Sequence, residues 1–297
     1  MGFTGDLAIA LHVGHYLTRR ENGEKVPDAV DAGYPFSHVV DRLRAADWLL
    51  GNMECVVSPK GIVATDHNPL RAPVFTPKLL KDAGIDVVSV ANNHSLDFGT
   101  AAFDDTLARL TAAGMPYIGG HVSSNGPEEP FITTVNGIKI GYLGFYLREQ
   151  DGLVADVLRA RPKVDLLITF FHWGADDQTE PLKLQRDRGK AVIDAGADLV
   201  VGTHTHVLQP EEWYKGKLIF YGLGNFVFSG MNFDDKHRTG AYLEVDMGPK
   251  GLLDRRMYRT TLDGVGAPHW LDQDQTDPPR VDGSESPNLP ARATKTN

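Results

Sequence analysis

The segment ADLVVGTHTH, residues 197–206, decides the fold class. Its apolar run from Asp198 to Val201 is typical of a buried strand, and two histidines follow with one residue between them. If the backbone stays extended, His204 and His206 point their rings the same way, so that one or two divalent cations could take a nitrogen from each. Two histidines alone are weak evidence, and the rest of the chain decides whether they belong to a metal site.

Polar residues also follow four other predicted strands. The segments are FTGD ending at Asp6, WLLGNME containing Asn52 and Glu54, VVSVANNH ending at Asn93 and His94, and LLITFFHWG containing His172. The carboxyl ends of parallel strands open into one crevice, where open α/β folds usually bind ligands. We therefore expect one shared metal site, with ligands from Asp6, Glu54, Asn93, His172, His204 and His206.

The chemistry of this set favours a transition metal. Mixed oxygen and nitrogen ligands suit manganese, zinc or iron more than magnesium alone. Ionised Asp6 and Glu54 would form an uncompensated cluster of negative charge, and one or two bound divalent metal ions are the simplest remedy. Each residue also has a plainer interpretation, because Asp6 could cap a loop, Asn93 could make a turn and His172 could be a hydrogen-bonded core histidine. These interpretations do not explain why five strand ends share polar residues.

Strands and helices alternate along the chain before strands predominate. Helices are predicted from Thr76-Pro77 to Gly84, over 100–113 and over 181–195, and strands over 85–91, 115–118, 166–171 and 199–201. Two hairpins are predicted, 132–135 with 139–143 and 213–214 with 218–221, and further strands over 241–245 and 256–262. This order predicts an α/β protein with a mostly parallel sheet.

Composition limits the domain organisation and the function. A chain of 297 residues with 41% hydrophobic content can bury one sizeable core, so we expect one domain over residues 1–270. Residues 271–297 are rich in proline, serine and aspartate and are expected to form a disordered tail. The net charge of −9 argues against nucleic-acid binding. The single cysteine, Cys55, excludes an internal disulfide, and we expect it to be a small buried strand residue.

The sequence carries no membrane or export signal. No stretch approaches the roughly 18 apolar residues that a spanning helix needs, and the N-terminus has no charged region followed by an apolar one. The chain as written is therefore expected to be cytoplasmic. If an upstream segment has been removed, the expected location is the cell envelope.

Other polar residues receive weaker assignments. The remaining histidines are expected to be surface or structural residues, namely His12, His15, His38, His67, His121, His237 and His269. Three cations are weak candidates for contacting an anionic substrate, namely Arg71, Arg148 and Lys183. The segment Gly222–Phe226 is expected to form a tight turn packed close to the site, with a structural role.

The ordered motifs FTGD, NMEC, ANNHSLDFG, HWGADD, GTHTHVLQPEE and YGLGNFVF resemble the CapA family of capsule and poly-γ-glutamate synthesis proteins. That family looks like a branch of the calcineurin-like metallophosphatase superfamily. The resemblance implies a four-layer α/β/β/α sandwich of the metallo-dependent phosphatase type, with a two-metal centre at the strand ends. It also implies individual roles. One metal would be bound by Asp6 and His206, and the other by Asn93, His172 and His204.

The resemblance also implies an acid and two departures from the superfamily pattern. His94 corresponds to the superfamily's acid or charge-stabilising histidine, with Asp97 as its partner. Asn52 stands where a bridging aspartate is common, so Glu54 would take over part of that role. The first motif usually reads Asp-x-His, whereas this chain has alanine at position 8, so the first metal loses an imidazole. Asp176 likewise replaces a common glutamate.

Three functional hypotheses follow. The first is a metal-dependent hydrolase acting on a phosphoester or a cell-envelope polymer, because metal coordination lowers the pKa of bound water. The second is a non-catalytic accessory protein that binds the polymer during polyglutamate or capsule synthesis or export. The third is a purely structural protein with an empty site. The expected partners are an anionic polymer or a small phosphoester and a membrane-bound capsule synthesis complex, and the oligomeric state is not predicted.

Overall fold

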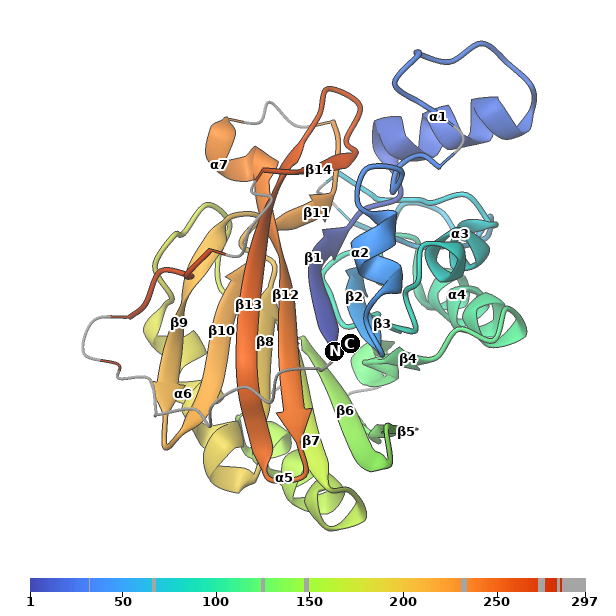
Figure 1. Cartoon of the computed structure of the whole chain (residues 1–297). Coiled ribbons are helices and arrows are strands. Elements are labelled where there is room, and N and C mark those ends of the chain that lie inside the picture. Colours follow the sequence, from blue (N-terminus) through green and yellow to red (C-terminus); the bar gives the residue numbers. More distant parts are fainter. Residues whose placement is uncertain are drawn as a thin grey trace.

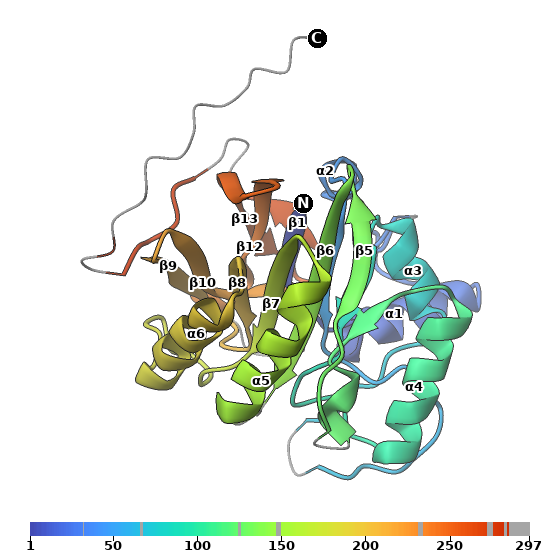
Figure 2. The same ribbon diagram turned by 90° about the horizontal axis from the view of Figure 1, so that it is seen from below.

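The computed structural model describes residues 1–31, 33–65, 68–123, 126–146, 150–230, 234–271, 276–281 and 284. These residues form two β-sheets packed face to face, with helices on both outer faces (Figure 1; Figure 2). The four-layer α/β/β/α sandwich expected from the sequence is therefore confirmed. None of the helices in the described ranges is long and apolar enough to cross a bilayer.

The first sheet has a parallel half and an antiparallel half. Its order is β14 (Pro268–Trp270), β13 (Gly251–Leu262), β12 (Thr239–Gly248), β1 (Gly2–Leu7), β2 (Leu49–Met53), β3 (Val87–Ser89) and β4 (Tyr117–Ile118), and β11 (Asn225–Val227) pairs with the end of β1. Strands β1 to β4 run parallel, and β12 runs antiparallel to β1. The carboxyl ends of the parallel strands therefore lie at the same end of the sheet.

The second sheet has a parallel centre with a hairpin at each side. Its order is β5 (Phe131–Val135), β6 (Ile138–Tyr146), β7 (Leu166–His172), β8 (Leu199–Thr203), β10 (Lys217–Leu223) and β9 (Leu208–Tyr214). Strands β6, β7, β8 and β10 are parallel, whereas β5–β6 and β9–β10 are antiparallel pairs. Both predicted hairpins are confirmed.

Helices cover the outer faces in two groups. The first sheet carries α1 (Leu11–Glu21), α2 (Val40–Arg44), α3 (Thr76–Asp82) and α4 (Thr100–Ala112), and the second carries α5 (Gln150–Ala160) and α6 (Lys183–Ala195) (Figure 2). A short α7 (Asp235–Arg238) precedes β12. The predicted helices at 76, 100–113 and 181–195 are confirmed as α3, α4 and α6. Helices α1 and α2 were not predicted, and neither has a side-chain cap at its start that could have marked it.

The core consists of three apolar layers because the strands alternate their apolar side chains between two faces. In β7, Ile168 and Phe170 point into the layer between the sheets, whereas Leu167 and Phe171 pack beneath α5 and α6. A strand with both faces apolar can be buried on both sides, which requires a second sheet on one side and helices on the other. The polar residues at the strand ends are thereby left at the rim of this core.

The structure differs from the predicted tail over residues 276–281. Thr276 bridges to Met257 of β13 and Arg280 bridges to Glu211 of β9. Val281 is buried against the apolar layer of the second sheet. The polar composition of this segment did not indicate that it packs against the sheets. One of its polar residues, Arg280, pairs with the buried carboxylate of Glu211. Residues 285–297 lie outside the described residues.

Candidate metal centre

Three polar side chains stand in a row across adjacent strands of the first sheet. Asp6 of β1 is in register with Asn52 of β2 on one side and with Asn225 of β11 on the other. All three are fully buried. Nδ2 of Asn52 donates a hydrogen bond to Oδ1 of Asp6 at 2.8 Å. Burial, the largest influence, raises the pKa of the Asp6 carboxyl above its ordinary value, although His206 and the Asn52 hydrogen bond act in the opposite direction.

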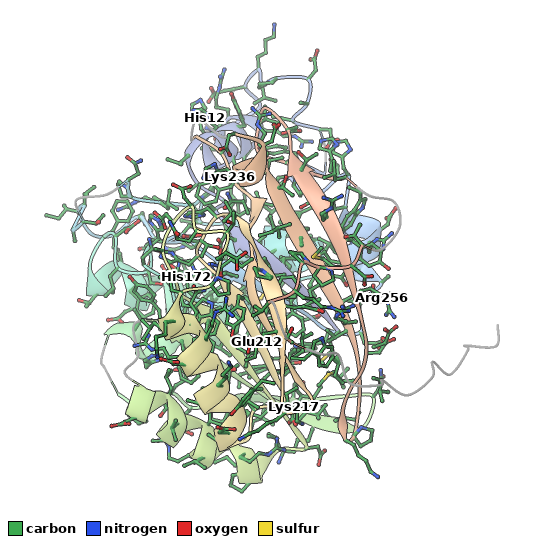
Figure 3. The ribbon with its side chains drawn as sticks, turned by 90° about the vertical axis from the view of Figure 1, so that its left-hand side faces the viewer. His12, His172, Glu212, Lys217, Lys236 and Arg256 are labelled. Atoms are coloured by element: carbon green, nitrogen blue, oxygen red, sulfur yellow. The ribbon has the colours of Figure 1, made fainter. Side chains whose placement is uncertain are left out.

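His172, from the second sheet, lies against this row of side chains. It is the last residue of β7, at the end of the second sheet opposite to Lys217 (Figure 3). Its Nδ1 lies 3.1 Å from the amide nitrogen of Asn52 and 3.1 Å from the hydroxyl of Thr203. Its Nε2 lies 2.8 Å from Oδ1 of Asn93. Burial, and then the neighbouring imidazoles, lower the pKa of His172 well below the ordinary value, so the ring is held neutral, as a metal ligand must be.

Glu54 follows β2 and is the most unusual group of the site. Its side chain is fully buried, and neither of its carboxylate oxygens has a hydrogen-bond partner in the described part of the chain. Oε1 lies 3.5 Å from Nε2 of His172 and 3.8 Å from Nε2 of His94. Burial, and then the charge of Asp6, raise the pKa of Glu54 well above the ordinary value. A buried carboxylate without donors is costly unless a cation neutralises it.

The two histidines after β8 converge on the site, but their backbone is not extended as expected. His204 and His206 have φ values of +97° and +58°, so the backbone turns at each of these two residues. Their ring centroids nevertheless lie 6.2 Å apart. At this turn the backbone N–H of His204 donates to Oδ2 of Asp6 at 3.4 Å.

Each of these two imidazoles has a distinct environment. Nδ1 of His204 is buried without a hydrogen-bond partner in the described residues, and burial lowers the pKa of His204 to about 4. Nδ1 of His206 lies 2.9 Å from Oδ1 of Asn225 and 3.6 Å from Oδ2 of Asp6. Asp176 lies at the outer side, where its Oδ1 is 3.6 Å from Nε2 of His204.

His94 and Asp97 form a pair beside Glu54. Nδ1 of His94 lies 2.8 Å from Oδ2 of Asp97, and the same oxygen accepts the backbone N–H of Leu70 at 2.7 Å. Both side chains are buried. The carboxylate therefore fixes the orientation of the imidazole and leaves its Nε2 facing Glu54.

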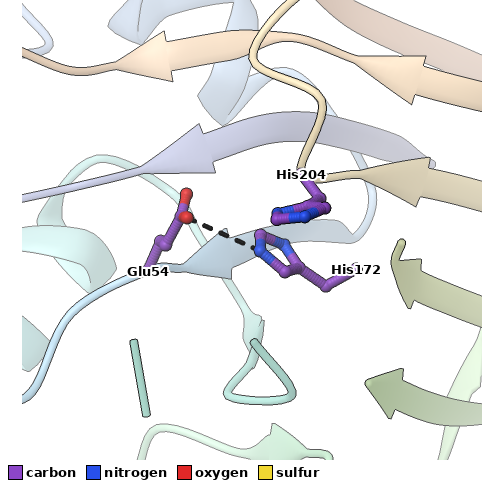
Figure 4. A group of neighbouring side chains, drawn as sticks. All are labelled: Glu54, His172 and His204. Atoms are coloured by element: carbon purple, nitrogen blue, oxygen red, sulfur yellow. Dashed lines mark ion pairs between the residues drawn. The ribbon is translucent and has the colours of Figure 1, made fainter. Parts of the chain in front are cut away.

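The residues present fit a divalent cation. Two groups of side chains each have one ligand atom per residue within 4.8 Å of the others. The first is Glu54 with His172 and His204 (Figure 4), and the second is Asp6 with Glu54 and His206. Glu54 belongs to both groups. The two carboxylate oxygens of Glu54 and Nδ1 of His204 are buried without a hydrogen-bond partner in the described ranges, which is the state expected of ligands prepared for a metal.

The structure brings together every residue that the sequence placed at the site. These are Asp6, Asn52, Glu54, Asn93, His94, Asp97, His172, His204 and His206, and their individual roles stay predictions. The other histidines have separate places. His121 is buried beside Glu128, His38 stacks on His269, and His12 and His15 are exposed. His237 contacts Asp177 and Asp234, and His67 lies outside the described residues.

Two of the weak candidates for substrate binding, Arg71 and Lys183, have other partners. Arg71 donates to the carbonyls of Lys60 and Gly61, and Lys183 pairs with Asp187 on the surface. Arg148 lies outside the described residues. Cys55 is buried as expected, although it follows β2 and does not lie within a strand.

Sequence reasoning missed two asparagines that organise the site. Asn225, in a segment expected to be purely structural, contacts Nδ1 of His206 and donates to the carbonyl oxygen of His237. Asn92, to which the sequence analysis gave no role at the site, donates to Oδ1 of Asn52 at 3.1 Å and accepts the backbone N–H of His94 at 3.2 Å. Asn225 is separated by Gly224 from the strand that ends at Leu223, so it does not stand directly at the end of a predicted strand.

Comparisons with known proteins concern the family and the fold of this chain. The family model described as bacterial capsule synthesis protein PGA_cap matches residues 1–230. The capsule biosynthesis protein CapA of Bacillus anthracis is 33% identical over 253 residues, which cover 77% of this chain and 59% of that protein. The PGA biosynthesis protein CapA of Bacillus subtilis (strain 168) is 34% identical over 246 residues, which cover 76% and 64% of the two chains. The chain thus spans less than two thirds of either relative.

A solved structure shares the fold. A hypothetical protein from Thermus thermophilus superposes with a TM-score of 0.55 at 18% sequence identity. The alignment covers 87% of this chain and 97% of that protein. At this identity the likeness concerns the fold alone.

Proposed function

This chain belongs to the bacterial capsule synthesis protein family PGA_cap, and on that premise we propose that it is a metal-dependent hydrolase acting on a phosphoester or a polymer of the cell envelope. The observation that carries the proposal is the buried, unpartnered carboxylate of Glu54 between two groups of candidate ligands. A protein that only needed a stable fold would gain nothing from burying this charge.

The donor set defines the proposed cofactor. Asp6, Glu54 and His206 would hold one cation, and Glu54, His172 and His204 would hold another, with Asn93 beside His172. Imidazole and carboxylate donors together favour manganese, zinc or iron. When bound, such a cation supplies Lewis acidity and lowers the pKa of a water molecule towards neutrality.

His94 is the proposed acid. Because Oδ2 of Asp97 holds its Nδ1, the Nε2 atom is the one that faces the site, and it is available to give a proton to a leaving oxygen. The backbone N–H of Leu70 holds the Asp97 carboxylate in place. Such a positioned acid contributes roughly 10²- to 10⁴-fold to a rate.

The proposed substrate is anionic. The two CapA relatives are named for the synthesis of a capsule and of PGA, and we extend that role to this chain, with an anionic capsule polymer such as polyglutamate as its ligand and a membrane-bound synthesis complex as its partner. The net charge of −9 gives no broad attraction for a polyanion, so capture must occur at the site itself. Small phosphoesters are the simplest compounds that match the same chemistry.

The test combines metal content with turnover. Protein loaded with manganese or zinc and washed is expected to retain metal, to hydrolyse a generic aryl phosphate and to lose both properties after chelation. His204→Ala is expected to lose metal and activity, whereas His15→Ala, which removes an exposed histidine from α1, is expected to retain them. Activity that survives chelation or His204→Ala would overturn the proposal.

A second candidate is a polymer-binding accessory protein without turnover. It is favoured by position 8, where an apolar, buried alanine occupies the place of a superfamily histidine, and by Asn52, whose neutral amide replaces a carboxylate. Both departures weaken a first metal position. Binding of glutamate oligomers by metal-loaded protein, with no cleavage product in mass spectrometry, would favour this candidate over hydrolysis.

A further inference from the structure

A cavity of about 120 Å³ opens beside the candidate metal centre, between the end of β7 and helix α6. His172 and His204, two of the candidate ligands, form part of its wall. Trp173, Leu184 and Arg188 form other parts. A molecule in this cavity would therefore touch the metal centre at one end and Arg188 at another.

Arg188 has no partner within the described part of the chain. Its Nε atom is buried and makes no hydrogen bond there. Its neighbour Arg186, on the same helix, differs in this respect, because it donates to the carbonyl of Pro181 and lies 3.8 Å from Glu180 and 3.9 Å from Glu212. A guanidinium group without an acceptor is unfavourable, and a planar anion in the cavity that Arg188 lines would provide an acceptor.

Trp173, Leu182 and Leu184 form an apolar part of the cavity wall. Trp173 stacks on Phe171 with the ring centroids 4.1 Å apart, and its indole N–H donates to the carbonyl of Tyr221 at 2.8 Å. Leu182 and Leu184 stay 39% and 54% exposed at the start of α6. Exposed leucines beside a fixed indole favour a ligand with methylene groups over a compact, fully hydrated anion.

The charge distribution also distinguishes the two ends of this cavity. The carboxylates of the metal centre, Asp6 and Glu54, do not line this cavity, and its imidazoles His172 and His204 do. Arg188 is the arginine that lines the cavity, and the weak candidates Arg71 and Lys183 are engaged elsewhere. An anionic group would thus be attracted to the end at Arg188.

We propose that Arg188 binds a carboxylate borne on a short aliphatic chain, whose methylene groups lie against Trp173 and Leu184. Binding in this way places the substrate bond next to that chain at His172 and His204. Of this proposal, only the reaction at that bond rests on the proposed function. Carboxylate binding itself needs neither a metal nor turnover. Arg188 thereby determines which substrates are held.

The test uses metal-free protein so that no cation can bind the probe. Glutarate is titrated while the indole N–H signal of Trp173 is followed by NMR, with Trp173→Phe used to identify that signal. Glutarate is expected to shift the signal in a saturable way. Arg188→Gln is expected to raise the dissociation constant about tenfold or more, because it removes a charged hydrogen-bond donor, and Arg188→Lys is expected to restore part of the affinity.

The control is Arg186→Gln, which removes the same charge from the same helix and is expected to leave binding unchanged. Equal binding to wild type and Arg188→Gln would overturn the proposal, as would methyl phosphate producing the same Arg188-dependent shift at lower concentration. The outcome is separable from that of the hydrolase test. If the protein binds glutarate through Arg188 but cleaves no aryl phosphate, the proposed carboxylate pocket stands and the proposed hydrolase reaction is wrong.

Discussion

Nε2 of His172 lies 3.5 Å from Oε1 of Glu54, across the gap between the two sheets of the molecule. The imidazole ends β7 of the second sheet, whereas the carboxylate follows β2 of the first sheet. Because both groups are fully buried, whatever charge is placed between them is screened little by water. A cation at this position would therefore link the two halves of the sandwich as well as complete the site.

Glu54→Gln is expected to change stability in opposite directions with and without metal. Burial raises the pKa of the Glu54 carboxyl, so its contribution to stability is present below the ordinary value of 4.5 and is lost as the pH rises through the folded value. Metal-free Glu54→Gln should thus be more stable than the wild type at pH 8, by about 1 kcal/mol or more, and should gain nothing from manganese. Urea denaturation at several pH values, with and without a chelator, measures both effects. A less stable metal-free variant at pH 8 would show that a protein group already neutralises the carboxylate.

His94→Ala is expected to reduce turnover by roughly 10²-fold or more while leaving the bound metal unchanged, because the ring acts on the leaving group. Asp97→Asn should reduce turnover less, since it disturbs only the orientation of the ring. Steady-state kinetics on an aryl phosphate and metal analysis on the same samples provide the comparison. If activity falls only in proportion to lost metal, His94 is a ligand and not the acid.

Asn225→Ala is expected to lower metal affinity by roughly 10- to 100-fold without abolishing binding, because Asn225 orients His206 and does not itself belong to either ligand group. Competition with a metal-binding dye measures the affinity. His15→Ala serves as the control, and circular dichroism establishes that the variant is folded. Unchanged affinity would show that His206 is oriented by the backbone alone.

Glu211→Ala is expected to destabilise the fold by about 3–5 kcal/mol, because it leaves the buried guanidinium of Arg255 without its carboxylate. Arg280→Ala should cost about 1 kcal/mol or less, since that side chain is 42% exposed. Urea denaturation of both variants measures the two losses in the free energy of unfolding. Equal losses would mean that residues 276–281, and not the buried pair, provide the stability.

The sequence predicted the positions of the site residues better than their geometry. Asp6, Glu54 and His172 each lie at or near the end of a mainly apolar run, and strand ends in a parallel sheet converge. The four-layer fold followed from the motifs, and the apolar runs marked most of its strands. These features are local, so that a short window of residues contains them.

The parts that could not be predicted depend on contacts between distant segments. Asn225 reaches Asp6 because a strand of three residues joins the end of β1, which no local pattern marks. The left-handed backbone at His204 and His206 accompanies a hydrogen bond from the His204 N–H to Asp6, which is 198 residues away in the sequence. Arg188 was overlooked for the same reason, because the side of α6 that faces the cavity is set by packing on the second sheet.

The segment from Pro279 to Val281 has a consequence for how the protein behaves in a cell. The backbone N–H of Glu211 donates to the carbonyl of Pro279 at 2.8 Å, and Val281 donates back to the carbonyl of Glu211 at 2.9 Å, so this segment covers the outer edge of β9. Proteolytic removal of the segment would expose a row of unsatisfied backbone groups on which another molecule could add a strand. Clipped material is therefore expected to aggregate at concentrations where the intact chain stays dispersed.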